Sequence, residues 1–120
     1  MSDASSTTGP SDAATADEVR LVMSQFLRAI NTGAADAAKE IFPDAPSIYD
    51  LIQLAKRCQF TFVACGHPYL QGKRILAKCH VRSTAPGEKY QSKITWEFER
   101  RGDQLVIVRP ELGPLITIDP

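Results

Sequence analysis

The residues best suited to chemistry in this 120-residue chain are Cys65, His67 and His80. Thiolate and imidazole bind zinc, and three such ligands with an open fourth position would suit a catalytic ion. The predicted strand register places Cys65 opposite His80 on an outer sheet face, with His67 on the same face. It also places Lys78 opposite His67 and Lys93 opposite His80, and cations beside a divalent ion are unfavourable. Because CxxC and HxxxH spacings are missing as well, we interpret this cluster as a polar sheet face and predict no metal or other cofactor.

A second group of side chains lies on the inner face of the same predicted strands. It consists of Cys79, Tyr90, Ser92 and Trp96, with Tyr49 approaching from a helix. A concave face of this kind can hold a small hydrophobic ligand, which Tyr and Ser would orient. The alternative is that Trp96 and its neighbours fill the core, while the Tyr90 hydroxyl reaches solvent at the rim. Both interpretations stay open at this point.

The outer face of the predicted sheet mixes aliphatic and charged side chains. A solvated face normally carries fewer aliphatic residues, and an apolar centre with charged edges is typical of a protein interface. We therefore expect a homodimer that forms through this face. The candidate residues are Leu76, Lys78, His80, Lys93, Glu97, Val106 and Val108.

Helical periodicity predicts the elements of the first half of the chain. Up to about residue 58, apolar residues recur at three- and four-residue steps. This spacing predicts a long helix that starts at a Thr15–Glu18 capping box and ends at Gly33. A short helix over 35–42 and a third helix after Pro46 follow.

From Cys58 onward, apolar and polar residues alternate, which predicts β-strands. The expected strands cover 60–65, 75–82, 90–99 and 104–109, with a fifth short strand over 115–118. Two-residue turns at Gly72-Lys73 and Gly102-Asp103, the latter a turn rather than an Arg-Gly-Asp adhesion signal, fix a register. The predicted pairs are Leu70–Ile75, Ala64–Val81, Cys79–Ile94, Ala77–Trp96 and Phe98–Ile107.

Composition narrows the class of protein. The chain has 14 Lys plus Arg and 14 Asp plus Glu, which argues against a nucleic-acid partner or a membrane surface. Residues 1–15 are acidic and rich in Ser, Thr and Ala, so we predict a disordered tail followed by a single domain over 16–120. The lack of a secretory signal and the odd number of cysteines, 3, lead us to expect a cytoplasmic protein.

Several segments resemble nuclear transport factor 2-like domains. Phe26-Leu-Arg-Ala-Ile-Asn-Thr-Gly33 and the following Ile41-Phe-Pro-Asp44 resemble the opening of these domains, and Gln71-Gly-Lys-Arg-Ile-Leu-Ala77 is similar to their hairpin. Ala34 departs from the Asp that is usual after the Gly. The resemblance implies an α+β fold: three N-terminal helices packed on a curved antiparallel sheet of four to five strands. This cone is shared with ketosteroid isomerases and polyketide cyclases.

The resemblance does not extend to catalytic residues. Catalytic relatives use an acid in the middle of the chain and a second acid with a Tyr deep in the cone. Here Asp44 lies in a turn, and alternation directs Glu97 and Glu99 outward. We therefore expect no catalytic residue and a non-catalytic binding or assembly module, homodimeric and with a candidate pocket for a small hydrophobic ligand. The alternative is an isomerase, dehydratase or cyclase that acts on a small apolar substrate in the concave pocket.

Overall fold

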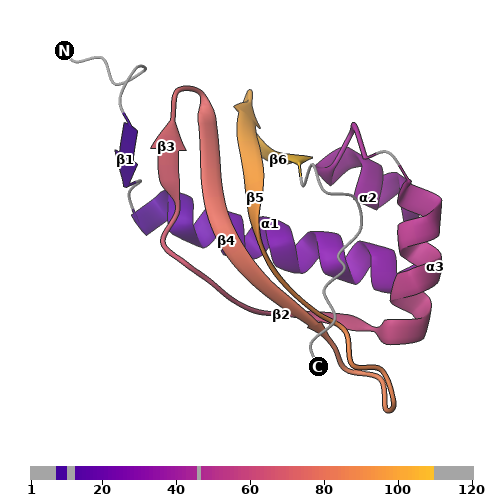
Figure 1. Ribbon diagram of the computed structural model, residues 1–120. Helices are drawn as coiled ribbons and strands as arrows, with labels where there is room; N and C mark the ends of the chain where they lie inside the picture. Colours follow the sequence, from indigo (N-terminus) through magenta and orange to yellow (C-terminus); the bar gives the residue numbers. More distant parts are fainter. Residues whose placement is uncertain (1–7, 11–12, 46, 110–120) are drawn as a thin grey trace.

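The fold consists of three helices packed on an antiparallel sheet, as a computed structural model shows for residues 8–10, 13–45 and 47–109 (Figure 1). The helices are α1 (Ala13–Thr32), α2 (Ala35–Ile41) and α3 (Ile48–Cys58). The strands are β1 (Thr8–Pro10), β2 (Phe60–Cys65), β3 (Tyr69–Gln71), β4 (Arg74–Ser83), β5 (Gln91–Arg101) and β6 (Gln104–Arg109). The predicted α+β class is confirmed. None of the helices in these ranges is long and apolar enough to cross a membrane.

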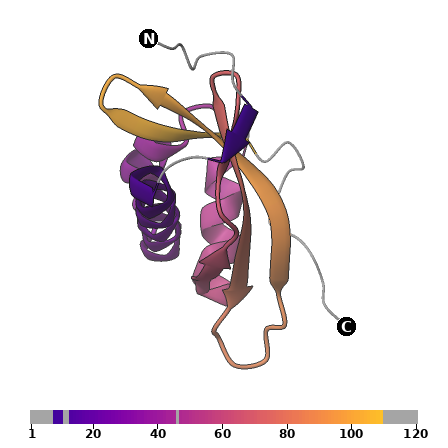
Figure 2. The ribbon, with the colours of Figure 1, turned by 90° about the vertical axis from the view of Figure 1, so that its left-hand side faces the viewer.

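The sheet follows the order β1-β3-β4-β5-β6, and β2 also pairs with β4. Strands β2 and β3 lie one after the other along the same edge of β4, β2 beside residues 79–83 and β3 beside residues 74–76. The helices lie on one side of the sheet, and the β5–β6 end bends over them (Figure 2). We call the side that the helices cover the inner face and the opposite side the outer face.

The core forms where α1 packs on the inner face. Val19, Met23, Phe26 and Ile30 follow each other at three- and four-residue steps and are fully buried, as expected of an amphipathic helix. The Trp96 ring meets Phe26 edge-on, with ring centroids 6.2 Å apart. Burying each such side chain contributes about 1.5–3 kcal/mol to folding.

Asn31 joins the end of α1 to the start of β2. Its side-chain amide donates to the Phe60 carbonyl at 2.8 Å, and its Oδ1 accepts from the Phe60 amide at 2.9 Å. The side chain thus satisfies the backbone of Phe60 as a neighbouring strand would. Gly33 follows with a φ of +79°, and this left-handed conformation ends the helix as predicted.

The predicted register is confirmed over most of the sheet. Leu70 pairs with Ile75, Cys79 with Ile94, Ala77 with Trp96, and Phe98 with Ile107. The predicted pairing of Ala64 with Val81 is wrong, because Ala64 pairs with His80 and Phe62 with Val81. Two irregularities cause the shift: a break at residues 66–68 between β2 and β3, and a bulge between Phe62 and Ala64.

The register shift moves Cys65 to the inner face. Its partner across the sheet is Cys79 and not His80, since a shift by one residue exchanges the two faces of a strand. The proposed grouping of Cys65 with His67 and His80 on the outer face is therefore wrong. In the described ranges, no group of three His, Cys, Asp or Glu side chains could hold a metal ion.

The N-terminal region also differs from the prediction. Residues Thr8–Pro10 form an edge strand on β3, and α1 begins at Ala13, so the predicted disorder over 1–15 does not apply to those positions. An edge strand requires only backbone hydrogen bonds and no apolar side chains. The predicted helix start at Thr15 is wrong, since α1 begins at Ala13. The Glu18 carboxylate accepts from Arg100 at 2.7 Å and 2.9 Å. Residues 1–7 and the expected strand over 115–118 lie outside the described residues.

Candidate functional site

Three of the predicted pocket residues lie together on the inner face. Cys79 is opposite Ile94, and Ser92 and Trp96 stand two positions to either side of Ile94 on β5. All three are buried. The Trp96 indole packs against Phe26, which in turn packs on Phe42 with centroids 5.8 Å apart. At Trp96, the inner face is therefore occupied by the protein's own core.

Two polar atoms on this inner face have no hydrogen-bond partner in the described part of the chain. They are the Ser92 hydroxyl oxygen and the Trp96 indole nitrogen. An unsatisfied buried polar group costs about 1–3 kcal/mol. These two buried groups therefore keep unused hydrogen-bonding capacity on the inner face.

Tyr90 lies directly before the start of β5. The ring is half-buried and meets Phe60 edge-on at 5.8 Å. Burial, and to a smaller extent the nearby Cys58, raise the pKa of the Tyr90 hydroxyl. Beside it is a surface hollow of about 300 Å³ whose other lining residues are Arg82, Ser83, Glu88, Lys89 and Gln91.

Tyr49 does not approach the inner face, so this part of the predicted pocket is wrong. Helix α3 buries Ile48, Ile52 and Ala55, and Tyr49 lies off that stripe with 61% of its surface exposed. The Lys39 ammonium lies 4.8 Å from the Tyr49 ring centroid and donates to the Tyr49 hydroxyl at 3.3 Å. Tyr49 thus joins α2 to α3 on the outside of the molecule.

The predicted dimer residues on β4 and β5 lie side by side on the outer face. Leu76 is opposite Glu97, and His80 is opposite Lys93. Lys78 and Lys93 are exposed, whereas Leu76 is only 8% exposed and Val106, on β6, only 4%. Leu76 and Val106, two of the three aliphatic residues of the predicted dimer face, are therefore mostly buried within the single chain.

One contact on this face differs from the expected arrangement. Glu97 pairs with Arg109 and not with Val108, because a bulge interrupts the β5–β6 register between Glu97 and Phe98. Val108, which is half-buried, therefore occupies the bulge region.

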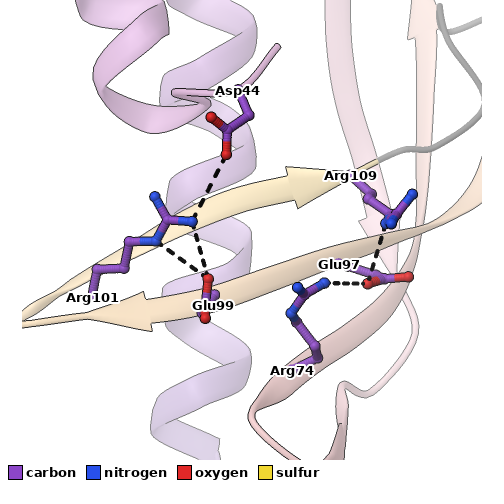
Figure 3. Close-up of polar contacts among 6 residues, drawn as sticks. All are labelled: Asp44, Arg74, Glu97, Glu99, Arg101 and Arg109. Carbon is purple, nitrogen blue, oxygen red and sulfur yellow. Dashed lines mark hydrogen bonds and ion pairs between the residues drawn. The ribbon is translucent and has the colours of Figure 1, made fainter. Parts of the chain in front are cut away.

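Glu97 and Glu99 face outward, as predicted, and arginines hold both of them (Figure 3). Glu97 Oε1 accepts from Arg74 at 2.9 Å and lies 3.9 Å from Arg109. Glu99 pairs with Arg101 at 3.1 Å, and Arg101 also reaches Asp44 at 3.9 Å. Each such partly exposed pair contributes about 0–1 kcal/mol, so the network mainly orients the side chains. We call this part of the outer face the ion-paired end.

The other end of the outer face is basic. Lys78 and Arg82 flank His80 on β4, Lys93 is opposite His80, and all three cations are exposed. The His80 ring is held by a hydrogen bond of 2.6 Å between Nε2 and Gln91 Oε1. We call Lys78, His80, Arg82 and Lys93 the basic end.

The inner face carries little that could act as an acid or base. Among the described residues, Ser92 is the one polar side chain that is buried. A general acid or base is most often a histidine or a carboxylate whose surroundings shift its pKa, and the carboxylates of β5 lie on the outer face.

Two features near these sites escaped prediction from sequence. The two hydrogen bonds of Asn31 form because β2 lies next to the end of α1 in the folded chain. The residues around the end of a helix do not reveal which strand will lie there. The pairing of Cys65 with Cys79 depends on the break at Gly66-His67-Pro68. Proline cannot donate to a strand ladder, so Pro68 was a signal that could have revealed the break.

Comparison with solved structures identifies a similar fold. The chain resembles a structure titled "Ntf2 like protein involved in plasmid conjugation", with a TM-score of 0.57 and 18% sequence identity over 87% of this chain. The match covers 41% of that structure, so this chain spans less than half of its length. Comparisons with protein-family models and with curated proteins found no match. The architecture is therefore the nuclear transport factor 2-like fold, as the sequence resemblance implied.

Proposed function

We propose that the protein is a non-catalytic assembly module that forms a homodimer through the outer face of its sheet. The observation that carries this proposal is that the helices cover one face of the sheet, while the other face carries exposed side chains. The helices cover the inner face (Figure 2), where Trp96 is buried. On the outer face, Lys78, Thr95 and Lys93 are exposed. The surface of the sheet that remains available for binding is thus the outer one.

The charges of the outer face are arranged so that two copies can complement each other. The basic end carries Lys78, Arg82 and Lys93. The ion-paired end carries Glu97 and Glu99, which pair with Arg74, Arg101 and Arg109. In a two-fold dimer each patch meets the partner's copy of the same face. If the strands of the two copies run antiparallel, the basic end of each lies over the ion-paired end of the other, where Lys93 can add a contact to Glu99 beside Arg101.

Charge reversal tests this arrangement. Lys93→Glu and Glu99→Lys are each expected to weaken the dimer about tenfold, because each places like charges in contact across the interface. The double variant restores opposite signs and should regain most of the affinity. Sedimentation equilibrium at micromolar concentrations measures all three. Gln53→Glu, an exposed position on α3, is the matched control and should sediment like the wild type.

Two outcomes would contradict the proposal. A wild-type protein that stays monomeric throughout the micromolar range would overturn the dimer itself. A dimer that tolerates Lys93→Glu and Glu99→Lys as well as it tolerates Gln53→Glu would place the interface elsewhere.

The neighbour in the structure comparison is described as involved in plasmid conjugation. Fold similarity does not carry function from one protein to another, so the present proposal extends to assembly and not to that process. For location we propose the cytoplasm, since all three cysteines are free thiols, as is usual in a reducing compartment.

A second candidate function is the binding of a small hydrophobic ligand at the inner face. The unpartnered Ser92 hydroxyl and Trp96 indole nitrogen favour it, since they could orient a ligand with one polar group. Native mass spectrometry of protein purified from cells should then show a mass above that of the chain, which denaturation removes. Identical native and denatured masses for each subunit would rule this candidate out.

A further inference from the structure

Cys65 on β2 and Cys79 on β4 lie directly opposite each other in the sheet. The neighbouring residues Gly66 and Lys78 form a hydrogen-bonded position, because the Gly66 amide donates to the Lys78 carbonyl at 2.9 Å. Cys65 and Cys79 therefore occupy a non-hydrogen-bonded position, where Cα atoms lie about 4.5 Å apart and side chains come closest. Disulfides span Cα separations of about 4.4–6.8 Å, so this pair has the backbone geometry of a cross-strand disulfide.

The two thiols differ in their access to solvent. Cys79 is fully buried, whereas Cys65 is half-buried. Burial, and then the neighbouring Cys65 sulfur, raise the pKa of the Cys79 thiol. Cys65 is also close to Arg20 of α1, whose pKa is raised mainly by Asp17 and to a lesser extent by the Cys65 sulfur. Cys65 is thus the thiol that a dissolved oxidant reaches first, with a cation at its side.

The third cysteine has a different environment. Cys58 is buried at the end of α3, and its thiol donates to Glu88 Oε1 at 3.6 Å. Burial, followed by the Glu88 carboxylate, raises the pKa of the Cys58 thiol. Because Cys58 belongs to α3 and not to the paired strands, it serves as an internal control.

We propose that Cys65 and Cys79 are a redox modification site, at which hydrogen peroxide converts the two thiols into a cross-strand disulfide. The Cys65 thiolate attacks one peroxide oxygen, the O–O bond breaks, and the departing hydroxide takes up a proton to become water. Cys65 is then a sulfenic acid. The Cys79 sulfur attacks the Cys65 sulfur, the S–O bond breaks, and a second water leaves with the Cys79 proton. Overall, two thiols are oxidised to one disulfide and one peroxide is reduced to two waters.

The disulfide would fix the least regular part of the sheet. The bridge closes a loop that contains the break at residues 66–68 and the β3–β4 hairpin, which also carries β1. Closing a loop stabilises the folded chain chiefly by restricting the unfolded one. We therefore expect the oxidised protein to unfold at a higher temperature than the reduced protein.

Peptide mapping tests the proposal on the full chain. The reduced protein is treated with hydrogen peroxide, the remaining thiols are alkylated in denaturant, and the protein is digested with trypsin without reduction. Cys58 and Cys65 fall in one tryptic peptide, 58–73, and Cys79 falls in another, 79–82. We expect these peptides to be linked, with the number of free thiols falling from three to one. Fragmentation between Cys58 and Cys65 should show alkylated Cys58 and bridged Cys65.

Two variants complete the test. Cys65→Ala should abolish the link and leave Cys79 available for alkylation, whereas the matched Cys58→Ala should retain it. A bridge that fragmentation assigns to Cys58, a link between two chains, or Cys65 oxidised to sulfinic acid beside a free Cys79 would each overturn the proposal. So would three free thiols after treatment. Because fragmentation is done on the wild-type protein, the result does not depend on either variant folding.

Discussion

Asn31 shows how a single side chain can join two elements that are far apart in sequence. Its two hydrogen bonds to Phe60, at 2.8 Å and 2.9 Å, satisfy a strand backbone that would otherwise face the end of a helix. Removing the side chain leaves both a donor and an acceptor without a partner at a half-buried position.

We predict that Asn31→Ala lowers the free energy of unfolding by about 2–3 kcal/mol, since each unsatisfied backbone group costs about 1–3 kcal/mol. Urea denaturation measures the loss. Asn31→Asp keeps the acceptor but loses the donor and should fall between Ala and the wild type. The neighbouring Thr32→Ala, which removes a bond to the Arg28 carbonyl within the same helix, is the control. A change below about 0.5 kcal/mol for Asn31→Ala would show that water replaces the side chain at no cost.

The buried thiols predict a loss of stability in alkali. Burial raises the pKa values of Cys79 and Cys58 above the ordinary value of 9.0, and that of Tyr90 above 10.0. Below about pH 8 these groups are protonated in both states and the free energy of unfolding is constant. Above about pH 9 the unfolded chain releases their protons while the folded chain retains them, so stability falls by up to about 1.4 kcal/mol per pH unit for each group.

Urea unfolding at pH 7, 9 and 10, a range that runs from about two units below to about one unit above the ordinary thiol value of 9.0, measures this slope with a reducing agent present. In Cys79→Ala the slope should be smaller than in the wild type, although the variant starts from a lower stability. A slope that is the same in both proteins would mean that Cys79 does not contribute.

At the scale of the elements, the chain's periodicity was sufficient to predict the helices and most of the strand register. The spacing of apolar residues along α1 and the alternation along β4 and β5 depend on local sequence. The residue pairs between β4 and β5 are accordingly as expected. Both errors on the edge of β4 come from irregular geometry: the bulge at Val63 and the break before Pro68. A prediction that assumes strict alternation cannot account for an extra residue. It therefore assigns Ala64 and Cys65 to the wrong faces of the sheet.

The candidate site was predicted unevenly for the same reason. Cys79, Ser92 and Trp96 come from regular strands and lie on the face that alternation predicts. To predict where the Tyr49 side chain points, one must know how α3 is rotated about its own axis. That rotation depends on packing among the three helices. The burial of Leu76 and Val106 depends on the tertiary structure around the sheet, about which alternation says nothing.

Gly33 provides a test at the end of a helix. Its φ of +79° is unfavourable for residues with a side chain, and a Cβ there would lie 3.0 Å from Lys56 Cε. Gly33→Ala is therefore expected to lower the free energy of unfolding by about 1–2 kcal/mol. Gly33→Asn should cost less, because Asn tolerates the left-handed conformation while meeting the same lysine. Equal losses for Ala and Asn would assign the effect to the lysine contact instead of the backbone.

At the scale of the whole molecule, a net charge of zero conceals an uneven distribution. The exposed cations Lys78, Arg82 and Lys93 gather at one end of the outer face, while the carboxylates at the other end are paired with arginines. We propose that the basic end contacts the ion-paired end of a second copy, although the molecule as a whole is neutral. The attraction between the two ends should weaken with added salt.

The most direct test of the proposed dimer face is the reactivity of its lysines. Brief acetylation of the wild-type protein over a range of concentrations, followed by peptide mass spectrometry, measures the exposure of each lysine separately. Lys78 and Lys93 should lose reactivity as the protein concentration rises into the micromolar range, whereas Lys56, exposed on α3, should keep its reactivity. Equal reactivity of all three lysines at every concentration would contradict an interface on the outer face.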